Sequence, residues 1–304
     1  MSVIICMATY NGDRWLQEQI DSVIAQSYEG WQLLISDDGS SDATLEIIHD
    51  NVRRDSRMRF LDQRKGGRGA VGNFEYLLSE AARVSAEWVA LCDQDDVWHP
   101  EKLSLQRQQL QNFRACCSDL MLTNAKGEAT EVRFLQQLDS PLQPSVSSLL
   151  AHNSVVGCTL AVTAEVLDLA LPFPPGLRNH DWWLALCALC EGPLFCDSQT
   201  LVNYRQHDSN VVGAYDPLRQ LVHAPELFLR QRGVLSSQLV AVRVLIERLL
   251  HRQINPPQVL ENYLLQVGSD SLKKRFAALA FGEFAAPHRP LRALRMAAAL
   301  KKLD

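Results

Sequence analysis

Short apolar runs alternate with amphipathic segments through the first third of the chain. The runs are Val3–Thr9, Trp31–Ser36, Arg59–Leu61 and Glu87–Cys92. Between them, apolar residues such as Leu16, Ile20 and Val23 recur at three- and four-residue spacing, the period of a helix face. Strands that alternate with helices predict βαβ units, and continuous apolar runs predict strands covered on both faces. The pattern therefore predicts an α/β fold with a mostly parallel central sheet flanked by helices.

Three of the predicted strands end in polar side chains. The clusters are Thr9-Tyr10-Asn11, Asp37-Asp38 and Asp93-Gln94-Asp95-Asp96. In open parallel sheets, ligands bind beyond the carboxyl ends of the strands. Because these ends meet at the same edge of a sheet, we expect the three clusters to line one crevice.

The second half of the chain is less regular. An apolar run at Val155–Val162 predicts another strand, a helix opens at His180-Asp181, and the pattern after Asp216 is all-helical. Residues 216–304 carry fourteen Lys/Arg and seven Asp/Glu, a surplus of +7, whereas residues 1–215 carry −12, for a net charge of −5. We therefore predict one domain at 1–215 and a helical C-terminal region at 216–304, with the boundary near Ala214 to Pro217.

The composition is that of a globular protein, with 47% hydrophobic and 21% charged residues. The N-terminal MSVIICMATYNGD is short, lacks a basic start and contains Asn and Asp, so it predicts a first strand and not a signal peptide. No window approaches the roughly eighteen consecutive apolar residues of a membrane span. We expect a soluble or peripheral protein with no nucleic-acid partner.

Eight cysteines without an export signal predict a reducing cytoplasm. Cys187 and Cys190 form a single C-x-x-C on a helical stretch. A zinc site needs about four ligands, and no second pair stands nearby in the sequence. Core packing is therefore favoured over a metal site for this pair.

Asp93, Asp95 and Asp96 crowd like charges at the end of a predicted buried strand. They cannot all be buried and ionised unless a cation compensates them. Mg²⁺ or Mn²⁺ typically takes one or two carboxylates and shares its other positions with substrate phosphates. Alternatively, one Asp caps the following helix and the others are solvated. The neighbouring polar clusters favour the metal–phosphate interpretation.

The same crevice has features of a nucleotide site. An Asp at the end of the second strand can accept a hydrogen bond from a base N–H. The glycines of RKGGRGAVGN, residues 64–73, let the backbone approach phosphate or sugar, and Arg68 adds positive charge. No G-x-G-x-x-G follows the first strand and no GK[ST] loop is present, which disfavours a nicotinamide cofactor and an NTPase loop.

Two segments, ATYNGDRWLQEQIDSVIAQSYEGWQLLISDDGSSDAT and ALCDQDDVWHPEKL, resemble family 2 glycosyltransferases of the GT-A (Rossmann-like) fold. These are inverting enzymes that use nucleotide sugars. NHDWW and NYRQHDSNVVGA are similar, more narrowly, to bacterial rhamnosyltransferases of O-antigen and polysaccharide assembly. The resemblance covers about residues 2–215, with four motifs in the order of the family. The region after 216 carries no such resemblance.

The resemblance implies roles for individual residues. It assigns nucleotide and donor binding to Thr9, Tyr10, Asn11, Asp38, Asn73, Asp93 and Gln94, and the charge of the glycine-rich loop adds Arg68 to this set. It assigns a divalent cation, Mn²⁺ or Mg²⁺, to Asp95 and His207, and the catalytic base to Asp181. Two departures stand out: the family writes the base motif more often as Glu-Asp, and its loop at 64–73 is usually less basic and less glycine-rich.

Simpler interpretations stay open for several of these residues. Asp181 is also a first-turn acid of its helix, which the helix dipole favours in any case, and the two roles are compatible. His207 alone would be an ordinary surface or core histidine. Trp182 and Trp183 are either core residues or, for one of them, a floor for the acceptor sugar, since aromatic faces pack on sugar C–H groups.

The combined interpretation is an inverting, metal-dependent glycosyltransferase. It would transfer L-rhamnose from dTDP-L-rhamnose to a saccharide or a lipid-linked bacterial glycan. The alternatives are a UDP-hexose donor, a sugar nucleotidyltransferase, or a non-catalytic scaffold at a membrane. A nucleotidyltransferase should carry a basic glycine-rich loop directly after its first strand, where this chain has ATYNGD.

The C-terminal region mixes basic and apolar residues at helical spacing. Arg243, Arg248 and Arg252 lie among apolar residues such as Leu245 and Leu249. A helix pair packed on the catalytic domain explains this pattern. A surface that binds an anionic bilayer explains it too, since each basic residue near such a surface contributes about 1 kcal/mol. The second interpretation predicts a cytoplasmic protein held peripherally at the inner face of the cytoplasmic membrane.

Overall fold

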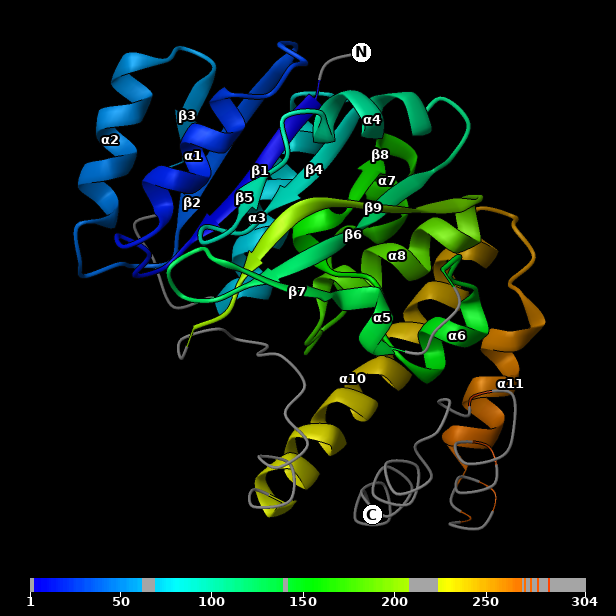
Figure 1. The fold of residues 1–304 in the computed structure, drawn as a ribbon. Coiled ribbons are helices and arrows are strands. Elements are labelled where there is room, and N and C mark those ends of the chain that lie inside the picture. The colour runs from blue at the N-terminus through cyan, green and yellow to red at the C-terminus, as the bar shows by residue number, and fades with distance from the viewer. Residues whose placement is uncertain are drawn as a thin grey trace.

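The computed structural model describes residues 3–61, 69–138, 142–207 and 224–269, and the single positions 271, 274, 278 and 284. Its centre is one sheet of nine strands in the order β3-β2-β1-β4-β8-β6-β9-β5, with β7 paired to β6 (Figure 1). The strands are β1 (Val3–Thr9), β2 (Trp31–Asp37), β3 (Met58–Phe60), β4 (Trp88–Cys92), β5 (Val97–Trp98), β6 (Ala115–Thr123), β7 (Ala129–Arg133), β8 (Ala161–Thr163) and β9 (Leu194–Arg205).

Helices cover both faces of this sheet. In chain order they are α1 (Leu16–Ile24), α2 (Thr44–Arg54), α3 (Gly69–Arg83), α4 (Lys102–Gln109), α5 (Phe134–Leu138), α6 (Val146–Ala151), α7 (Ala164–Ala170), α8 (His180–Glu191), α10 (Ala224–His251) and α11 (Gln258–Val267). The apolar run at Val155–Val162 is divided between a 3₁₀ turn, η1 (Gly157–Thr159), and the start of β8.

The predicted βαβ order is confirmed in the N-terminal part of the sheet. β1 pairs in parallel with β2 and β4, and β2 pairs in parallel with β3. Beyond β4 the sheet is mixed, because β8 runs antiparallel to both β4 and β6, and β5 antiparallel to β9. The carboxyl ends of β1, β2 and β4 therefore lie side by side, as the polar clusters predicted.

The core has two layers, one on each face of the sheet. Side chains of a strand alternate between its faces, so Val3, Ile5 and Met7 of β1 pack with α1, α2 and α4. Ile4 and Cys6 of the same strand pack in the other layer, with α3, α6, α7 and α8. Burial on both sides explains why these strands are apolar without interruption.

The C-terminal helices are part of this second layer. Leu245 and Leu249 of α10 and Tyr263 of α11 are fully buried in the same core as Trp182 and Trp183 of α8. These residues of α10 and α11 therefore pack on the part of the chain that carries the sheet, as the first of the two interpretations of this region expects.

Two of the basic residues in this region bind internal partners. Arg248 donates through Nη1 to the carbonyl oxygen of Leu169 at 2.8 Å and also contacts the carbonyl oxygen of Pro172. Arg252 forms an ion pair of 2.6 Å with Glu191 at the end of α8. Arg243 is exposed. Sequence spacing alone treats all three as equivalent, and packing separates them.

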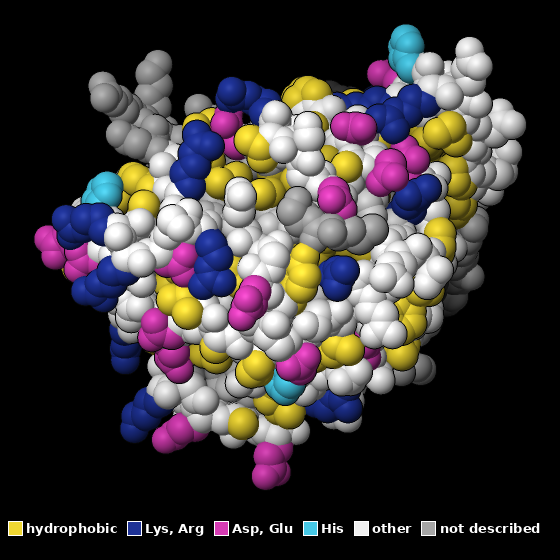
Figure 2. All heavy atoms as spheres, turned by 90° about the horizontal axis from the view of Figure 1, so that it is seen from above, with side chains coloured by type: hydrophobic (Ala, Val, Ile, Leu, Met, Phe, Trp, Pro, Cys, Tyr) yellow, Lys and Arg dark blue, Asp and Glu magenta, His cyan; other side chains and the backbone are white. Residues whose placement is uncertain are grey.

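Within the described residues, no helix combines the length and the apolar character needed to cross a membrane. Figure 2 shows the face seen from above Figure 1, where basic and acidic side chains of the described residues are interspersed. No single sign of charge dominates that face.

Candidate active site

The acidic loop 93–96 begins directly after β4 and leads into β5. The Gln94 side chain ties it to the loop after β1. Its Nε2 donates to the Tyr10 carbonyl oxygen at 2.9 Å, and its Oε1 accepts from the Tyr10 N–H at 2.8 Å. A Cβ on Gly12 would overlap the amide group of Gln94, so any larger residue there would displace this amide from its two hydrogen bonds. The amide of Gln94 positions two loops of the site relative to each other.

Asp95 faces His207, which follows the end of β9. The Nε2 of His207 lies 2.9 Å from Oδ2 of Asp95, and the two side chains are only 6% and 16% exposed. The imidazole ring stacks on Trp15 with centroids 3.9 Å apart and planes at 21°. The structure thus brings together the two residues to which the motifs assign a cation, across more than a hundred residues of sequence.

Asp96, the last residue of the acidic loop, and Arg205, at the end of β9, are both buried. The Arg205 N–H donates to Oδ1 of Asp96 at 3.2 Å, and its Nε donates to the Asp95 carbonyl oxygen at 2.9 Å. Its Nη2 forms an ion pair of 2.6 Å with Glu18 of α1. One arginine therefore connects the acidic loop, β9 and α1.

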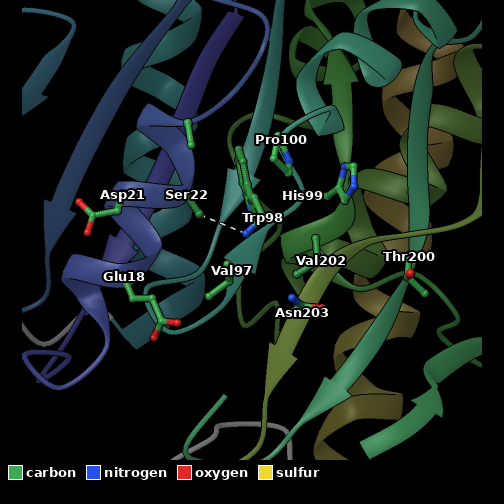
Figure 3. Close-up of a pocket in the computed structure, with 11 residues that line it drawn as sticks. Glu18, Asp21, Ser22, Val97, Trp98, His99, Pro100, Thr200, Val202 and Asn203 are labelled. Atoms are coloured by element: carbon green, nitrogen blue, oxygen red, sulfur yellow. Dashed lines mark hydrogen bonds between the residues drawn. The ribbon is translucent and has the colours of Figure 1, made fainter. Parts of the chain in front are cut away.

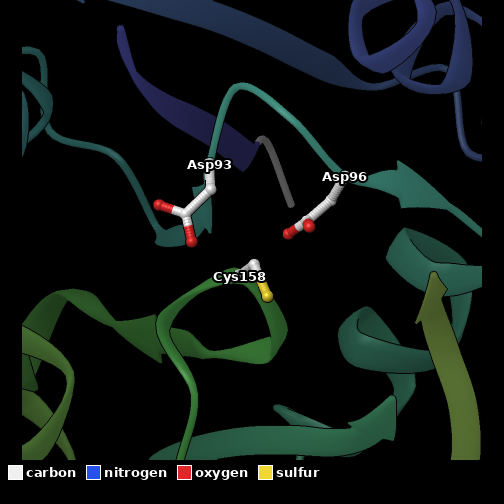
Figure 4. Close-up of side chains that lie close together, drawn as sticks. All are labelled: Asp93, Asp96 and Cys158. Atoms are coloured by element: carbon white, nitrogen blue, oxygen red, sulfur yellow. The ribbon is translucent and has the colours of Figure 1, made fainter. Parts of the chain in front are cut away.

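Asp93 and Asp96 face each other beside Cys158 of η1, as Figure 4 shows. One ligand atom from each of the three lies within 4.8 Å of the others. Burial, together with the charges of Asp95 and Asp181, raises the pKa of Asp93 to about 7. Burial and the charges of Asp95 and Asp93 raise the pKa of Asp96 well above its usual range. Oδ2 of Asp96 is buried without a hydrogen-bond partner.

These features fit a divalent cation. Crowded carboxylates with little access to water are stabilised by a positive charge. Oδ2 of Asp96 has no hydrogen-bond partner among the described residues, as expected for an oxygen that faces a ligand. The donors on offer are carboxylate oxygens, the His207 imidazole and the Cys158 thiol. Carboxylates suit Mg²⁺ and Mn²⁺, and an added imidazole favours a transition metal.

Asp181 stands in the first turn of α8, where the helix dipole favours a carboxylate. Its charge acts on Asp93, so the predicted base lies close to the acidic loop. Gly157 of η1 lies against this turn, since a Cβ there would be 3.2 Å from Nε2 of His180 and 3.7 Å from Cβ of Asp181. His180 stacks on Phe74 at 4.2 Å, and burial lowers the pKa of its ring.

The loops after β1 and β2 carry the residues that the motifs assign to binding the base of the nucleotide. Thr9 donates from Oγ1 to Oδ1 of Asp37 at 2.9 Å, and the Gly39 N–H donates to Oδ2 of Asp37 at 2.9 Å. Both carboxylate oxygens of Asp37 thus accept hydrogen bonds from the two loops themselves. Asp38, next to it, is half-buried and accepts from the Gly69 N–H at 2.8 Å, at the start of α3.

Asn11 and Tyr10 are exposed, and Tyr10 is 56% so. Oδ1 of Asn11 accepts from the Ser41 N–H at 2.8 Å. Asn73 is buried, and its Nδ2 donates to the Ser36 carbonyl oxygen at 2.9 Å, which fixes α3 to β2. Arg68 lies outside the described residues.

Trp182 and Trp183 belong to the core. They are 1% and 0% exposed, and their Nε1 groups donate to the carbonyl oxygens of Leu149 and Ala170, each at 2.9 Å. A ring without accessible surface cannot contact a sugar. The expectation that one of them forms the floor of the acceptor site is therefore wrong, and the core interpretation holds.

A cavity of about 440 Å³ lies on the other side of β5, between α1 and β9 (Figure 3). Glu18, Val97, Trp98 and Asn203 are among its lining residues. None of the predicted site residues lines it. Its contact with the crevice is indirect, through Glu18 and the Arg205 that it pairs with.

Known proteins share both the sequence and the architecture of this chain. A family model described as glycosyl transferase family 2 matches residues 4–143. UDP-Glc:alpha-D-GlcNAc-diphosphoundecaprenol beta-1,3-glucosyltransferase WfgD of Escherichia coli is 35% identical over 190 residues, which are 62% of this chain and 69% of that protein. The chain belongs to glycosyl transferase family 2. The dTDP-rhamnosyl transferase RfbG of Shigella flexneri is 27% identical over 219 residues, 68% of this chain and 74% of that protein.

Solved structures agree on the fold. S. aureus TarS 1-349, solved with UDP-GlcNAc, superposes with a TM-score of 0.58 at 15% identity, covering 99% of this chain and 90% of that chain. Mannosyltransferase PcManGT from Pyrobaculum calidifontis, solved with GDP-Man and Mn²⁺, superposes with a TM-score of 0.55 at 15% identity, covering 98% and 84%. The predicted GT-A fold of this glycosyl transferase family 2 member is confirmed.

Sequence reasoning missed several residues of the site of this family 2 enzyme. Trp15 stacks on His207, and Arg205 donates to the backbone of Asp95, although neither was singled out from the sequence. Both stand inside quoted motifs, GDRW and YRQH, so proximity to assigned residues was the available signal. Gly157 has no such signal, because its role depends on helix α8 approaching from elsewhere in the chain.

Proposed function

We propose that the chain transfers a sugar from a nucleotide diphosphate donor, dTDP-L-rhamnose in the first place, to a hydroxyl of a bacterial glycan or lipid-linked acceptor, with inversion at the anomeric carbon. One observation carries this proposal. The carboxylate of Asp181, at a helix N-terminus, acts electrostatically on Asp93, in the loop where Asp95 meets His207 at 2.9 Å. This proximity supports a general base at Asp181 beside a cation–diphosphate site at Asp95 and His207.

Asp181 is the proposed general base. It would accept the proton of the acceptor hydroxyl as that oxygen attacks the anomeric carbon. The first turn of α8 stabilises negative charge at this position. A single displacement with the base opposite the leaving group inverts the configuration.

Asp95 and His207 are the proposed cation ligands, with Asp93 beside them. A bound cation would neutralise charge that develops on the departing diphosphate. The imidazole donor favours Mn²⁺ over Mg²⁺, and the structural neighbour PcManGT was solved with Mn²⁺. Thr9, Asn11, Asp38 and neighbouring backbone would bind the base and sugar of the donor.

The donor assignment rests on the rhamnosyltransferase-like motifs and on the relative named dTDP-rhamnosyl transferase. A UDP-hexose is the second candidate, because a relative with higher identity is named as using UDP-Glc. That relative's name also contains a diphosphoundecaprenol acceptor, which supports a lipid-linked acceptor here. Work on such an acceptor would place the enzyme peripherally at the inner face of the cytoplasmic membrane.

The test is a transfer assay with Mn²⁺, a panel of undecaprenyl-diphosphate saccharides, and either dTDP-L-rhamnose or UDP-glucose. Asp181→Asn keeps the shape of the side chain and removes its basicity. We expect donor affinity within a few-fold of wild type and turnover lower by a factor of ~10² or more. Normal turnover in this variant places the base elsewhere.

Two further outcomes would replace the proposal. Diphosphate release from dTTP and a sugar 1-phosphate would make the protein a nucleotidyltransferase. Binding of nucleotide sugars without transfer or hydrolysis under any of these conditions would make it a scaffold.

A further inference from the structure

The ring of His207, which follows β9, is held by Trp15, which precedes α1. The two rings stack almost in parallel, at 3.9 Å and 21°. The edge of the imidazole meets Oδ2 of Asp95 at 2.9 Å. With 6% of its side chain exposed, His207 is thus held on one face and at one edge.

Trp15 is itself anchored at two points. Its backbone precedes α1 as the N-cap residue, and its N–H donates to the Gly12 carbonyl oxygen at 3.1 Å. Its indole Nε1 donates to the Ala125 carbonyl oxygen at 3.3 Å, in the turn between β6 and β7. The same oxygen accepts from Nη1 of Arg205 at 3.4 Å.

The Ala125 carbonyl oxygen therefore binds both Trp15 and Arg205, the two residues that hold the pair formed by Asp95 and His207. Through Arg205 it is linked to the backbone of Asp95, and through Trp15 to the ring of His207. Groups that orient metal ligands without binding the metal typically affect its affinity by about 10- to 100-fold. An imidazole that lost its stacking partner would gain rotamers that point away from Asp95.

We infer that Trp15 is a positioning residue for the cation site, acting through the ring of His207. This inference rests on the proposed function, since it takes Asp95 and His207 as the ligands. The indole face orients the imidazole ring, and the hydrogen bond of the indole N–H holds that face in place.

Trp15 could instead serve only the packing of α1. Tyr28 provides the matched control: it is a half-buried aromatic residue beyond the other end of α1, and an arginine stands 5.1 Å from its ring, as Arg14 does from Trp15. Tyr28→Ala removes an aromatic side chain that is half-buried like that of Trp15, with the same kind of cation contact, at a position away from the site. Both variants are compared by thermal unfolding.

The experiment measures Mn²⁺ affinity of the full chain by electron paramagnetic resonance of free Mn²⁺, alone and with dTDP. We expect Trp15→Ala to raise the Kd about tenfold, and Trp15→Phe, which keeps a stacking face, to raise it about threefold or less. Tyr28→Ala should leave it within about twofold. Turnover of Trp15→Ala should recover at high Mn²⁺, with an increased apparent KM for the metal.

A double-mutant cycle with His207→Ala gives the sharpest test. Once His207 is absent, Trp15→Ala should cause no further loss of Mn²⁺ affinity. An equal loss in both backgrounds, or an unchanged Kd in Trp15→Ala, overturns the inference. Where Trp15→Ala does not fold, Trp15→Leu replaces it, and equal affinities of the Leu and Phe variants overturn the inference as well.

The wild-type measurement distinguishes a failure of the cation assignment from a failure of the role of Trp15. Absence of Mn²⁺-dependent dTDP binding in the wild type overturns the cation assignment in the proposed function, and the role of Trp15 with it. Mn²⁺-dependent binding and transfer in the wild type, together with unchanged affinity in Trp15→Ala, overturns the role of Trp15 alone.

Discussion

Lys102 is fully buried behind the acidic loop, and its protonation should be visible in the stability of the protein. Its Nζ lies 3.5 Å from the centre of the Trp98 ring, and it donates to Oε1 of Gln106 at 3.4 Å. Burial lowers the pKa of this amine from 10.5 to about 8, opposed by neighbouring thiols and Asp96. The folded protein therefore releases the proton at a lower pH than the unfolded chain does.

The sign and size of the effect follow from linkage. Below about pH 8 both states carry the charge, and the folded state bears the cost of burying it. As the pH rises toward about 10.5, the folded state loses the proton first, so the free energy of unfolding gains a favourable contribution. The interval between the two pKa values corresponds to about 3 kcal/mol, of which about 2 kcal/mol should develop between pH 7 and pH 10.

Lys102→Met keeps the length of the side chain and removes the charge. Urea unfolding of wild type and variant at several pH values between 7 and 10 measures the difference in their free energies of unfolding. That difference should shift in favour of wild type by about 2 kcal/mol as the pH rises. The cysteines of the unfolded chain titrate in the same range, because burial raises the pKa of Cys92 and Cys158 in the folded protein well above their usual value, but this contribution is common to both proteins and largely cancels. Lys126→Met, at an exposed lysine, controls for the change in net charge.

A pH-independent difference between wild type and Lys102→Met would refute this reasoning. It would mean that Lys102 stays protonated in the folded state throughout, compensated by the Trp98 ring and Asp96. A shift in favour of the variant would reverse the sign and require a folded pKa above 10.5.

Three further predictions concern the site and the C-terminal region. Asp95→Ala should abolish Mn²⁺-dependent nucleotide binding in calorimetry, and Asp93→Ala should weaken it less; unchanged binding in the first variant would exclude Asp95 as a ligand. Gly12→Ala places a Cβ 2.2 Å from Gln94, so it should lower the free energy of unfolding by about 1–3 kcal/mol and weaken nucleotide binding. An unchanged urea midpoint would contradict that close approach. Liposome co-sedimentation should show binding to anionic vesicles that high salt reverses, whereas equal partitioning to neutral vesicles, or none, would leave the C-terminal region a packing or dimerisation element.

The order of strands and helices was predictable because each element carries its own period. The meeting of the polar clusters was predictable too, since parallel strands place their carboxyl ends together. Thr9 contacts Asp37, and Tyr10 contacts Gln94, as that geometry requires. The antiparallel pairings of β8 and β5 were not predictable, because register between distant strands leaves no local signal.

Other contacts between residues far apart in the sequence could not be predicted. Trp15 and His207 are separated by nearly two hundred residues, and nothing in their local patterns links them. For Trp182 and Trp183 a signal existed, because a helix apolar on all sides is usually a buried one, and WWLALCA is such a run. Counting charges after 216 could not show that Arg248 and Arg252 bind internal groups.

The core shared by α8, α10 and α11 limits how the chain can be shortened. Arg248 of α10 lies 5.6 Å from the Trp183 ring while it bonds the Leu169 carbonyl oxygen. A chain that ended near 215 would leave this side of α8 in water, and the first turn of α8 carries Asp181. The loops after β1, β2 and β4 do not depend on that cover. If Asp181 is the base proposed above, a truncated chain should therefore still bind nucleotide through these loops but lose transfer to the acceptor.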